Sequence, residues 1–516
     1  MKTILLAITS DIHGYLMPTT FRNEVEPLGL IKIAHEIEKL RNTAPTLLID
    51  NGDLIQGSPL TYYHNKYKKE TANPIIQLAN ELNYDLAVFG NHEFNYGQAF
   101  LKDAIHQSTF PWLAANILDE QGASITHPYI IKEIEGIRIG IIGVTTHFVP
   151  LWEDPEHIIG WHFEDAYESA KKWTTHLQES EDVDLIVLCY HGGFAHDLST
   201  GELIEGDTGE NQGYQMCRDL KFDIFITGHQ HREIAEKVYG KSVIQPGTKG
   251  TCLGVVRIEM EYDVDGNVSN FSHDPYLQYV DLQTPVNEKL VDIIRPIYDE
   301  TERWPDEVMG VIEGDCLFDD SFSVRVHKHP YIELIQKIQL EVSGAQTSCT
   351  ALFHDGPGGF PPNVTMRQIV TNYIYPNTLK VLNVSGKHIL EALEQNATYF
   401  SIENGELTVA QSFIYPKAQP YNYDMWEGID YEMHIREPIG SRVKNVYFMG
   451  KPLQTDEYYR VVMNNYRATG AGNFPYFAES KVVKDIQVDM TELIADYFAK
   501  HPSIKATCNR NWKVVY

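Results

Sequence analysis

The chain has 516 residues, more than one hydrophobic core usually holds, so we expect at least two domains. Hydrophobic residues make up 43% and charged residues 22%, as in an ordinary globular protein. The 71 acidic and 42 basic residues leave a net charge of −29, which argues against a protein that grips a nucleic-acid polymer. Small anionic substrates remain compatible with this charge if metal ions supply positive charge locally.

The first apolar segment, residues 4–8, is too short for a signal peptide, whose apolar region needs about 7–15 residues. It also leads directly into Asp11 and His13 without a small-residue cleavage site. We therefore predict a first core strand and a cytoplasmic protein. No later segment reaches the roughly 20 apolar residues of a membrane span, so we expect no membrane partner.

In the first half of the chain, short apolar segments are each followed by a polar or glycine-containing turn. Segment 29–41, between two of them, has apolar residues at near-helical spacing. Residues 185–188 are apolar on both faces, as in strands buried between layers. The pattern predicts an α/β sandwich around one or two sheets, with function at the carboxyl ends of the strands. The predicted strands cover 4–9, 46–50, 86–89, 184–190 and 223–227.

Residues 284–304 have a helical and highly charged pattern, which predicts a helix connecting an N-terminal domain (1–283) to a C-terminal domain (305–516). The second domain has apolar segments of its own and long loops rich in Pro, Gly, Asn and Tyr, which we expect to carry function. The six cysteines are scattered without a CxxC pair, which favours buried free thiols over a disulfide framework.

Side chains that can bind metal ions follow each of the five predicted strands. Each motif alone is weak evidence, because a lone histidine is usually a satisfied core or surface residue; His147, His196 and His354 stay in that class. Five motifs in one order, all at strand ends, make chance a poor explanation. The candidate residues are Asp11, His13, Asp53, Asn91, His92, His191, His229 and His231.

The donor types indicate which ions and which chemistry to expect. Mixed oxygen and nitrogen ligands suit Mn, Fe, Co or Zn better than Ca or Mg. The Asp53 carboxylate has two oxygens and can bridge a pair of cations. Two divalent ions about 3.5–4 Å apart can bind a phosphoryl group, activate water near neutral pH and stabilise the leaving oxygen. The sequence therefore predicts a two-metal phosphoesterase.

These motifs resemble those of the metallophosphoesterases of the 5′-nucleotidase and 2′,3′-cyclic-nucleotide 2′-phosphodiesterase family, over essentially the whole chain. The resemblance implies a four-layer α/β/β/α calcineurin-like domain, then the connecting helix and a C-terminal α/β nucleotide-binding domain, with rotation of the domains about the helix. The matching stretches are SDIHG (10–14), GD and GSP (52–59), GNHEF (90–94), AAN (114–116), HGG (191–193) and GHQH (228–231).

The resemblance also implies roles for the candidate residues. His92 would stay off the metals and act on the phosphoryl oxygens or the leaving group, as a histidine can. Many 5′-nucleotidases of the family carry an aspartate where this chain has Asn95, which can orient an imidazole but cannot favour its cationic form as a carboxylate does. One ion would be held by Asp11, His13, Asp53 and His231, the other by Asp53, Asn91, His191 and His229.

In the second domain the resemblance implies a nucleoside site in which Tyr431 and Tyr466 sandwich the base, with Asn464 and Gly472 beside them. Stacking of this kind contributes about 1–3 kcal/mol per base and tolerates any base. The alternative is that both are core tyrosines, because the chain has 30 tyrosines.

Several departures from the 5′-nucleotidase pattern bear on the substrate. Loop 354–360 lacks the expected arginine, and Gly-Ala-Gly-Asn at 470–473 replaces the Gly-Gly-Asp-Gly whose aspartate holds ribose hydroxyls. Segment 372–379 and Asn95 also resemble the cyclic-phosphodiesterase branch. We therefore expect hydrolysis of 2′,3′-cyclic nucleotides to 3′-nucleotides, then to nucleosides and phosphate. Alternatives are a 5′-nucleotidase or nucleotide-sugar hydrolase, a phosphoprotein phosphatase, and an inactive nucleotide-binding or scaffolding protein.

Overall fold

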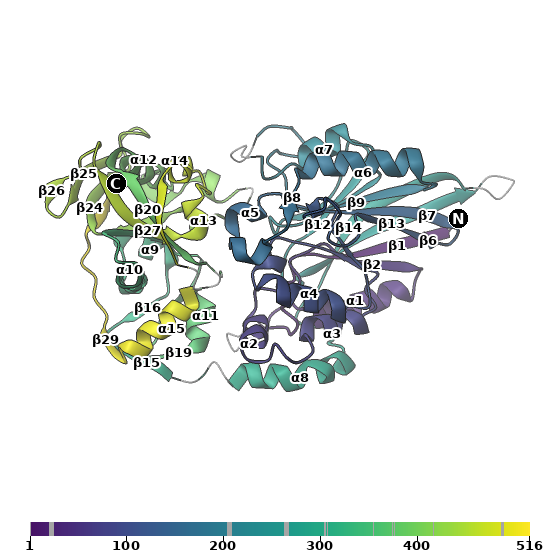
Figure 1. Ribbon diagram of the computed structural model, residues 1–516, viewed down its shortest axis with the longest axis horizontal. Helices are drawn as coiled ribbons and strands as arrows, with labels where there is room; N and C mark the ends of the chain where they lie inside the picture. Colours follow the sequence, from purple (N-terminus) through teal and green to yellow (C-terminus); the bar gives the residue numbers. More distant parts are fainter. Residues whose placement is uncertain are drawn as a thin grey trace. The chain divides into compact units, whose positions relative to one another are not determined.

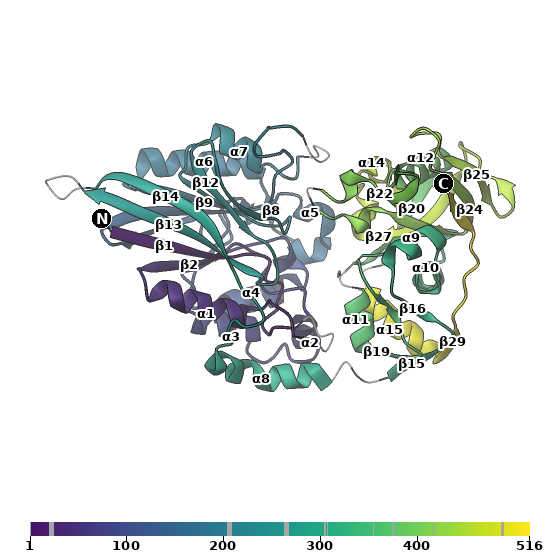
Figure 2. The ribbon, with the colours of Figure 1, turned by 180° about the vertical axis from the view of Figure 1, so that it is seen from behind.

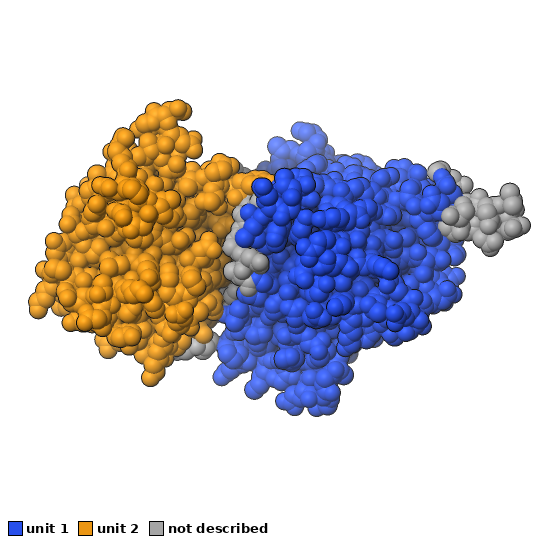
Figure 3. Space-filling model, turned by 90° about the horizontal axis from the view of Figure 1, so that it is seen from above, with its two compact units in different colours: residues 1–301 blue, residues 302–516 orange. Residues whose placement is uncertain are grey.

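The computed structural model describes residues 2–19, 25–203, 209–262, 268–303, 306, 308–353, 355–373, 375, 377–415, 417–486 and 490–516. It divides into two units, residues 1–301 (unit 1) and 302–516 (unit 2), which Figure 3 colours separately. Among the helices within these ranges, none combines the length and the apolarity that a bilayer crossing requires.

Unit 1 contains two six-stranded sheets. The first sheet has the strand order β14-β13-β1-β2-β3-β4, and the second has the order β11-β12-β10-β9-β7-β6. The first comprises β1 (Lys2–Thr9), β2 (Thr46–Asp50), β3 (Leu86–Val88), β4 (Trp112–Leu113), β13 (Cys252–Tyr262) and β14 (Val268–Tyr279). The second comprises β6 (Tyr129–Ile134), β7 (Ile137–Thr145), β9 (Leu185–His191), β10 (Ile224–Thr227), β11 (Glu233–Val238) and β12 (Lys241–Pro246). A separate two-stranded sheet pairs β5 (Ile117–Leu118) with β8 (His162–Phe163).

The two sheets pack face to face, because one apolar cluster takes residues from both. Ile4, Leu6 and Ile8 of β1 share it with strands of the second sheet, whereas Leu5 and Ala7 on the opposite face of β1 pack in the cluster beneath the helices. Side chains of a strand alternate between its two faces, so a strand between two apolar layers must be apolar throughout. This explains why segment 4–8 has no polar residue.

Helices cover the outer face of each sheet and complete the predicted four layers (Figure 1). Figure 2 shows the first sheet from behind, with β14, β13, β1 and β2 in sequence. Ser58 and Asn73 cap their helices by accepting a backbone N–H, each followed by a proline at the first helical position. The helices of unit 1 are α1 (Leu30–Arg41), α2 (Pro59–Tyr67), α3 (Pro74–Glu81), α4 (Gly97–Gln107), α5 (Val149–Trp152), α6 (Ala166–Ser180), α7 (Gly213–Asp219) and α8 (Glu288–Arg303), with 3-10 turns at His92–Phe94 and Pro155–Ile158.

Helix α8 begins at Glu288 and ends at Arg303, within the predicted connecting segment; Trp304 lies outside the described residues. Leu290, Val291 and Ile294 are buried in the cluster that covers the first sheet. The units divide at residues 301 and 302. The domain boundaries at 283 and 304 stay a prediction.

Unit 2 is built on a five-stranded sheet of order β23-β17-β27-β20-β28 and a four-stranded sheet of order β26-β25-β24-β30. Smaller sheets have the orders β19-β15-β29, β16-β18 and β21-β22. Two of the apolar segments of the second domain, residues 380–384 and 460–463, lie in β20 (Leu379–Ser385) and β27 (Tyr458–Asn464), which are paired antiparallel.

The remaining strands of unit 2 are β15 (Val308–Glu313), β16 (Cys316–Phe318), β17 (Thr347–Ala351), β18 (Gly358–Phe360), β19 (Asn363–Thr365), β21 (Phe400–Glu403), β22 (Glu406–Val409), β23 (Asp424–Glu427), β24 (Ile429–His434), β25 (Val443–Phe448), β26 (Lys451–Pro452), β28 (Lys481–Ile486), β29 (Ser503–Lys505) and β30 (Trp512–Val515). Its helices are α9 (Ser321–His327), α10 (Pro330–Ser343), α11 (Met366–Asn372), α12 (Gly386–Ala397), α13 (Asn465–Ala468), α14 (Pro475–Ala478) and α15 (Met490–Lys500), with 3-10 turns at Gln411–Phe413 and Pro420–Asn422.

Candidate active site

All eight candidate residues of unit 1 lie at or just after the carboxyl ends of parallel strands. β1, β2 and β3 are parallel neighbours in the first sheet, and β9 and β10 are parallel neighbours in the second. The loops after these five strands therefore leave both sheets in one region, which is where α/β folds bind ligands. Asp11 and His13 follow β1, Asp53 follows β2, Asn91 and His92 follow β3, His191 ends β9, and His229 and His231 follow β10.

Five of the seven predicted metal ligands have a left-handed backbone conformation, which residues other than glycine rarely adopt. Such conformations cost on the order of 1–3 kcal/mol each and persist where the surroundings enforce them, most often at functional sites. The concentration of strain in these loops indicates that they are shaped for binding. The φ angles are 55° at Asp11, 51° at His13, 56° at Asp53, 67° at His229 and 55° at His231.

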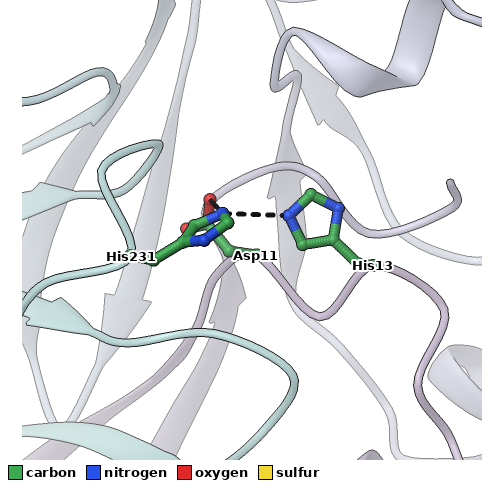
Figure 4. Close-up of side chains that lie close together, drawn as sticks. All are labelled: Asp11, His13 and His231. Atoms are coloured by element: carbon green, nitrogen blue, oxygen red, sulfur yellow. Dashed lines mark hydrogen bonds and ion pairs between the residues drawn. The ribbon is translucent and has the colours of Figure 1, made fainter. Parts of the chain in front are cut away.

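Asp11, His13 and His231 form one group whose ligand atoms all lie within 4.8 Å of one another. Their side chains point toward a common centre (Figure 4). The two Nε2 atoms of His13 and His231 are 3.1 Å apart, and Asp11 Oδ1 lies 3.4 Å from His231 Nε2. Asp11 is fully buried and His13 nearly so, which leaves His231 as the most exposed of the three.

Asp53, His191 and His229 form a second group of the same compactness. Asp53 Oδ2 lies 3.1 Å from His191 Nε2 and 3.9 Å from His13 Nε2, and so faces both groups. Its other oxygen accepts the backbone N–H of His92 at 2.8 Å, which orients the carboxylate. Asn91 Oδ1 is 2.8 Å from His229 Nδ1 and adds an amide oxygen to this group.

In three of the histidines, the ring nitrogen that faces away from the site is hydrogen-bonded to an oxygen. His13 Nδ1 faces the Gln56 carbonyl at 3.0 Å, and His191 Nδ1 faces the Asn51 carbonyl at 2.6 Å. Each Nδ1 must carry a proton to donate, so Nε2 is the atom of the neutral ring that has a lone pair for a cation. His229 is reversed, because its Nε2 bonds to the Glu210 carboxylate at 2.8 Å and leaves Nδ1 toward the site. Metal-binding histidines are commonly fixed in this way.

This donor set fits divalent cations. His191 Nε2 is completely buried, and the Asp53 carboxylate lies 3.1 Å from it without the geometry of a good hydrogen bond. Nδ1 of His229 and Oδ1 of Asn91 face each other at 2.8 Å, and a cation bound by both atoms would satisfy this contact. These facing oxygen and nitrogen donors would hold divalent metal ions.

The buried charges of the site are strongly coupled. Burial opposes the ionisation of Asp53 and His191, but their attraction outweighs it, lowering the pKa of Asp53 well below its ordinary value and raising that of His191 to about 10. Burial lowers the pKa of His13 to about 3, so its imidazole is neutral at physiological pH. Without a cation, therefore, the proton on His191 supplies the positive charge that faces Asp53.

In unit 2 the structure corrects one predicted substrate contact. Tyr431 lies on β24 with 2% of its surface exposed, stacked at 6.0 Å on Trp512 of the neighbouring strand β30. A ring without an exposed face cannot stack on a base. Tyr431 is therefore a core residue, as the alternative interpretation of the sequence allowed.

Tyr466 is half-buried, and its partner is Tyr421, which the sequence reasoning missed. The two ring centroids are 6.3 Å apart at 79°, and the ring of Tyr375 lies 6.3 Å from that of Tyr421 at 75°. Tyr421 belongs to the 3-10 turn before β23 and is half-buried. In the sequence, Tyr421 lies in the segment Gln-Pro-Tyr-Asn-Tyr at 419–423. This segment has no helical or strand periodicity that would have pointed to a site.

Arg467 joins the loops that carry these tyrosines. It is buried, its Nε donates to Asp424 Oδ2 at 2.6 Å, and its Nη2 donates to the Tyr421 carbonyl at 2.9 Å. Its guanidinium also lies over the rings of Phe474 at 4.0 Å and Tyr466 at 5.9 Å. One buried cation thus positions both tyrosines.

The two other predicted substrate contacts have structural duties. The Asn464 side chain is buried and caps α13 by accepting the Arg467 backbone N–H at 2.6 Å. Gly472 has a φ of 73°, and an added Cβ would lie 2.3 Å from Arg467 Nη1. Both therefore support the tyrosine loops. In loop 354–360, His354 lies outside the described residues, and Asp355 accepts a hydrogen bond from the buried Arg325 at 2.7 Å.

Comparison with known proteins supplies the family. Residues 4–233 match the calcineurin-like phosphoesterase family, and residues 308–479 match the 5′-nucleotidase C-terminal domain family. A Staphylococcus aureus protein assigned to the 5′-nucleotidases is 36% identical, with both chains covered completely and a TM-score of 0.90. The chain belongs to this family of two-domain metallophosphoesterases. Its members are phosphoric ester hydrolases.

The names of two related proteins refer to nucleotide substrates. The trifunctional nucleotide phosphoesterase YfkN of Bacillus subtilis is 27% identical over 98% of this metallophosphoesterase, which spans 38% of the length of YfkN. The 2′,3′-cyclic-nucleotide 2′-phosphodiesterase/3′-nucleotidase of Haemophilus influenzae is 25% identical over 99% of the chain, which covers 87% of that protein.

Glu93 is a further residue of the metallophosphoesterase site whose duty only the structure shows. Its buried carboxylate accepts the backbone N–H groups of Asp53 at 2.8 Å, Leu54 at 2.7 Å and Gly90 at 2.6 Å. It therefore ties the loop after β2 to the loop after β3. The loops are so close that a Cβ on Gly90 would lie 2.2 Å from Asp53 Oδ1.

The histidines that the sequence reasoning set aside lie in other surroundings. His147 Nε2 is 3.7 Å from the Asp165 carboxylate, and His196 stacks on Tyr214 with a centroid distance of 5.0 Å. Neither belongs to the two compact ligand groups found among the described residues. His92 is different, because its ring lies 5.2 Å from that of His13.

Proposed function

We propose that the protein hydrolyses nucleotide phosphoesters at a dinuclear metal centre, with 2′,3′-cyclic nucleotides as preferred substrates. The product of the first step would be a 3′-nucleotide, and a second hydrolysis would release the nucleoside and phosphate. The observation that carries this proposal is the position of Asp53 Oδ2, which faces His191 of one ligand group and His13 of the other.

The ligand groups would divide between two ions. Asp11, His13 and His231 with Asp53 would hold one, and Asn91, His191 and His229 with Asp53 would hold the other; Mn, Zn, Co and Fe suit these donors. When bound, the ions would supply positive charge for the phosphoryl oxygens and activate water.

The protein's own residues would do the rest. His92 lies beside the first ligand group without belonging to it, and so would contact the phosphoryl oxygens or the departing ribose oxygen. Tyr466, which is half-buried and edge-on to Tyr421, would stack on one face of the base, which gives affinity without strong base preference.

The choice of a cyclic substrate is supported by two features of the chain. Asn95 replaces the aspartate expected of a 5′-nucleotidase, and position 472 in the 470–473 loop is a glycine with no carboxylate to hold a free ribose diol. A phosphate on the 2′ and 3′ oxygens needs no such acid. Relatives of both kinds are known, since 5′-nucleotidases of Vibrio vulnificus and Vibrio parahaemolyticus are each 23% identical.

The test is a substrate profile of the protein after reloading with Mn, Zn, Co or Fe. Initial rates with 2′,3′-cyclic AMP, 3′-AMP, 5′-AMP and a nucleotide sugar would be compared at equal metal content. We expect the highest kcat/KM for 2′,3′-cyclic AMP. A preference for 5′-AMP or the nucleotide sugar would overturn the choice of substrate. Bound metal without turnover of any of them would support the inactive alternative.

A further inference from the structure

His92 is hydrogen-bonded to Asn95 of its own loop, and Asn95 is in turn bonded to Glu153 of a distant segment. His92 Nδ1 is 2.6 Å from Asn95 Oδ1, and Asn95 Nδ2 donates to Glu153 Oε2 at 2.6 Å. Glu153 comes directly after α5, far along the chain from Asn95. Its side chain is only 7% exposed.

The Glu153 carboxylate determines how the Asn95 amide is turned. An amide can present either its oxygen or its NH2 group to a neighbour, whereas an ionised carboxylate can only accept. Asn95 must therefore direct Nδ2 to Glu153 and Oδ1 to His92. His92 Nδ1 must then carry the proton and donate it to Oδ1.

This arrangement decides which nitrogen of His92 is available for chemistry. Nδ1 keeps its proton in both the neutral and the cationic imidazole, so Nε2 is the nitrogen that exchanges a proton with a substrate or water. Were the amide reversed, Nδ1 would have to accept from Nδ2, and Nε2 would carry the only proton of a neutral ring. Such a ring could not take up a second proton without losing its bond to Asn95.

Glu153 is itself held in place from its far side. Its Oε1 accepts the Asp154 backbone N–H at 2.8 Å and the His157 Nδ1–H at 2.8 Å. Both are donors, so the atom at that position must be an oxygen. The carboxylate thus has one oxygen for this anchor and one for Asn95.

We propose that Glu153 is a positioning residue for the phosphoester hydrolysis, which acts through Asn95 to keep the proton of His92 on Nδ1. This inference rests on the proposed function, because it assumes that His92 acts on the substrate. Asn95 and Glu153 together give His92 Nδ1 a hydrogen-bond acceptor of fixed orientation, as a single aspartate at position 95 would. Glu153 comes from a distant segment and lies in none of the sequence motifs.

The first test is Glu153→Gln. The anchor keeps the glutamine oxygen toward Asp154 and His157, so the new NH2 group faces Asn95 and reverses its amide. We expect kcat to fall about 10- to 100-fold, with KM and metal content near those of the wild type. Glu156→Gln makes the same chemical change on an exposed neighbour and is the matched control, for which we expect wild-type kinetics.

The second test adds Asn95→Asp to Glu153→Gln. A carboxylate at position 95 accepts from His92 with either oxygen and accepts the glutamine NH2 with the other, so it needs no external orientation. We expect this double variant to recover most of the lost kcat. A general weakening of the fold would instead leave it no faster than Glu153→Gln, and that result would overturn the proposal.

A spectroscopic measurement makes the inference independent of turnover. With 15N-labelled histidine, His92 of the zinc-loaded wild type should show the proton on Nδ1, and that of Glu153→Gln should show it on Nε2. The same His92 tautomer in both proteins, or full kcat in Glu153→Gln, would refute the role of Glu153 and leave the proposed function standing. Absence of nucleotide turnover in a wild type with the expected tautomer would refute only the proposed function.

Discussion

Asp53 of unit 1 and Tyr466 of unit 2 represent two ways of building a binding site. The residues around Asp53 lie at strand ends and are largely buried. Their side chains are held by hydrogen bonds to the backbone, with N–H groups as donors and carbonyl groups as acceptors. The tyrosine pair lies on loops, is half-buried, and depends on one buried arginine that reaches both loops. Rigid geometry matters most where charge must be placed to a fraction of an ångström, and less where flat rings meet a flat base.

The difference also concerns where conformational strain is placed. The metal-site loops contain five left-handed residues among the predicted ligands, whereas Tyr421 and Tyr466 are absent from the residues with positive φ. Strain of this kind persists only if neighbouring structure enforces it. At Asp53, Glu93 provides that enforcement by accepting backbone N–H groups of the two adjoining loops. We therefore expect substitutions in unit 1 to act on catalysis and substitutions in unit 2 on stability or binding.

The largest effect should come from a ligand. His191→Ala removes the imidazole nearest Asp53 Oδ2, and we expect the loss of one bound ion and a fall in kcat/KM of about 10³-fold or more. Elemental analysis and initial rates measure both. His196→Ala, a histidine stacked on Tyr214, is the control and should retain metal and activity. Equal metal content in the two variants would refute the ligand assignment of His191.

The next effect should be on the stability of unit 2. Arg467→Met leaves the Asp424 carboxylate buried without its partner, which costs about 3–5 kcal/mol in the free energy of unfolding. Urea denaturation measures this, with Arg460→Met on the exposed face of β27 as control. Adding Asp424→Leu removes the second charge and should restore much of the stability. If Arg467→Met were as stable as Arg460→Met, the arginine would not hold the loops.

A smaller effect should come from the carboxylate behind His229. Glu210→Ala removes the acceptor of the Nε2–H, and substitutions of this kind weaken metal affinity about 10- to 100-fold. Competition with a chelator measures the affinity of the weaker site. Glu202→Ala, an exposed glutamate of the same segment, should leave the affinity unchanged. Identical chelator curves for the two variants would count against the orienting role of Glu210.

The smallest effect should come from single tyrosines of the nucleoside site. Tyr421→Ala and Tyr466→Ala each remove one half-buried ring from the site, so we expect the lower end of the stacking range, about 1 kcal/mol, and a rise in KM for a nucleotide of about 5-fold. Tyr415→Ala changes an exposed tyrosine and serves as control. Tyr431→Ala should lower stability, since its ring is packed in the core. A KM effect for Tyr415→Ala as large as for Tyr466→Ala would exclude a nucleoside site at Tyr421 and Tyr466.

Much of unit 1 could be predicted because its information is local. The strands at 4–9 and 46–50 contain the uninterrupted apolar runs 4–8 and 47–49, and each ligand lies at the end of its strand or within four residues after it. Unit 2 was harder, because a tyrosine in a strand looks the same whether its ring is covered or exposed. Tyr431 is buried because β24 pairs with β30, and that pairing joins Tyr431 to Trp512 from the end of the chain.

By itself, then, the sequence determined the layered α/β architecture of unit 1 and the set of side chains at its strand ends, since hydrophobic period and motif order are properties of short segments. Only the tertiary structure decided that Tyr421 is the partner of Tyr466 and that Glu210, Glu93 and Glu153 orient the groups around them. The physical reason is that a hydrogen bond or ring contact depends on atoms within a few ångströms, and the chain brings those atoms together from segments tens of residues apart.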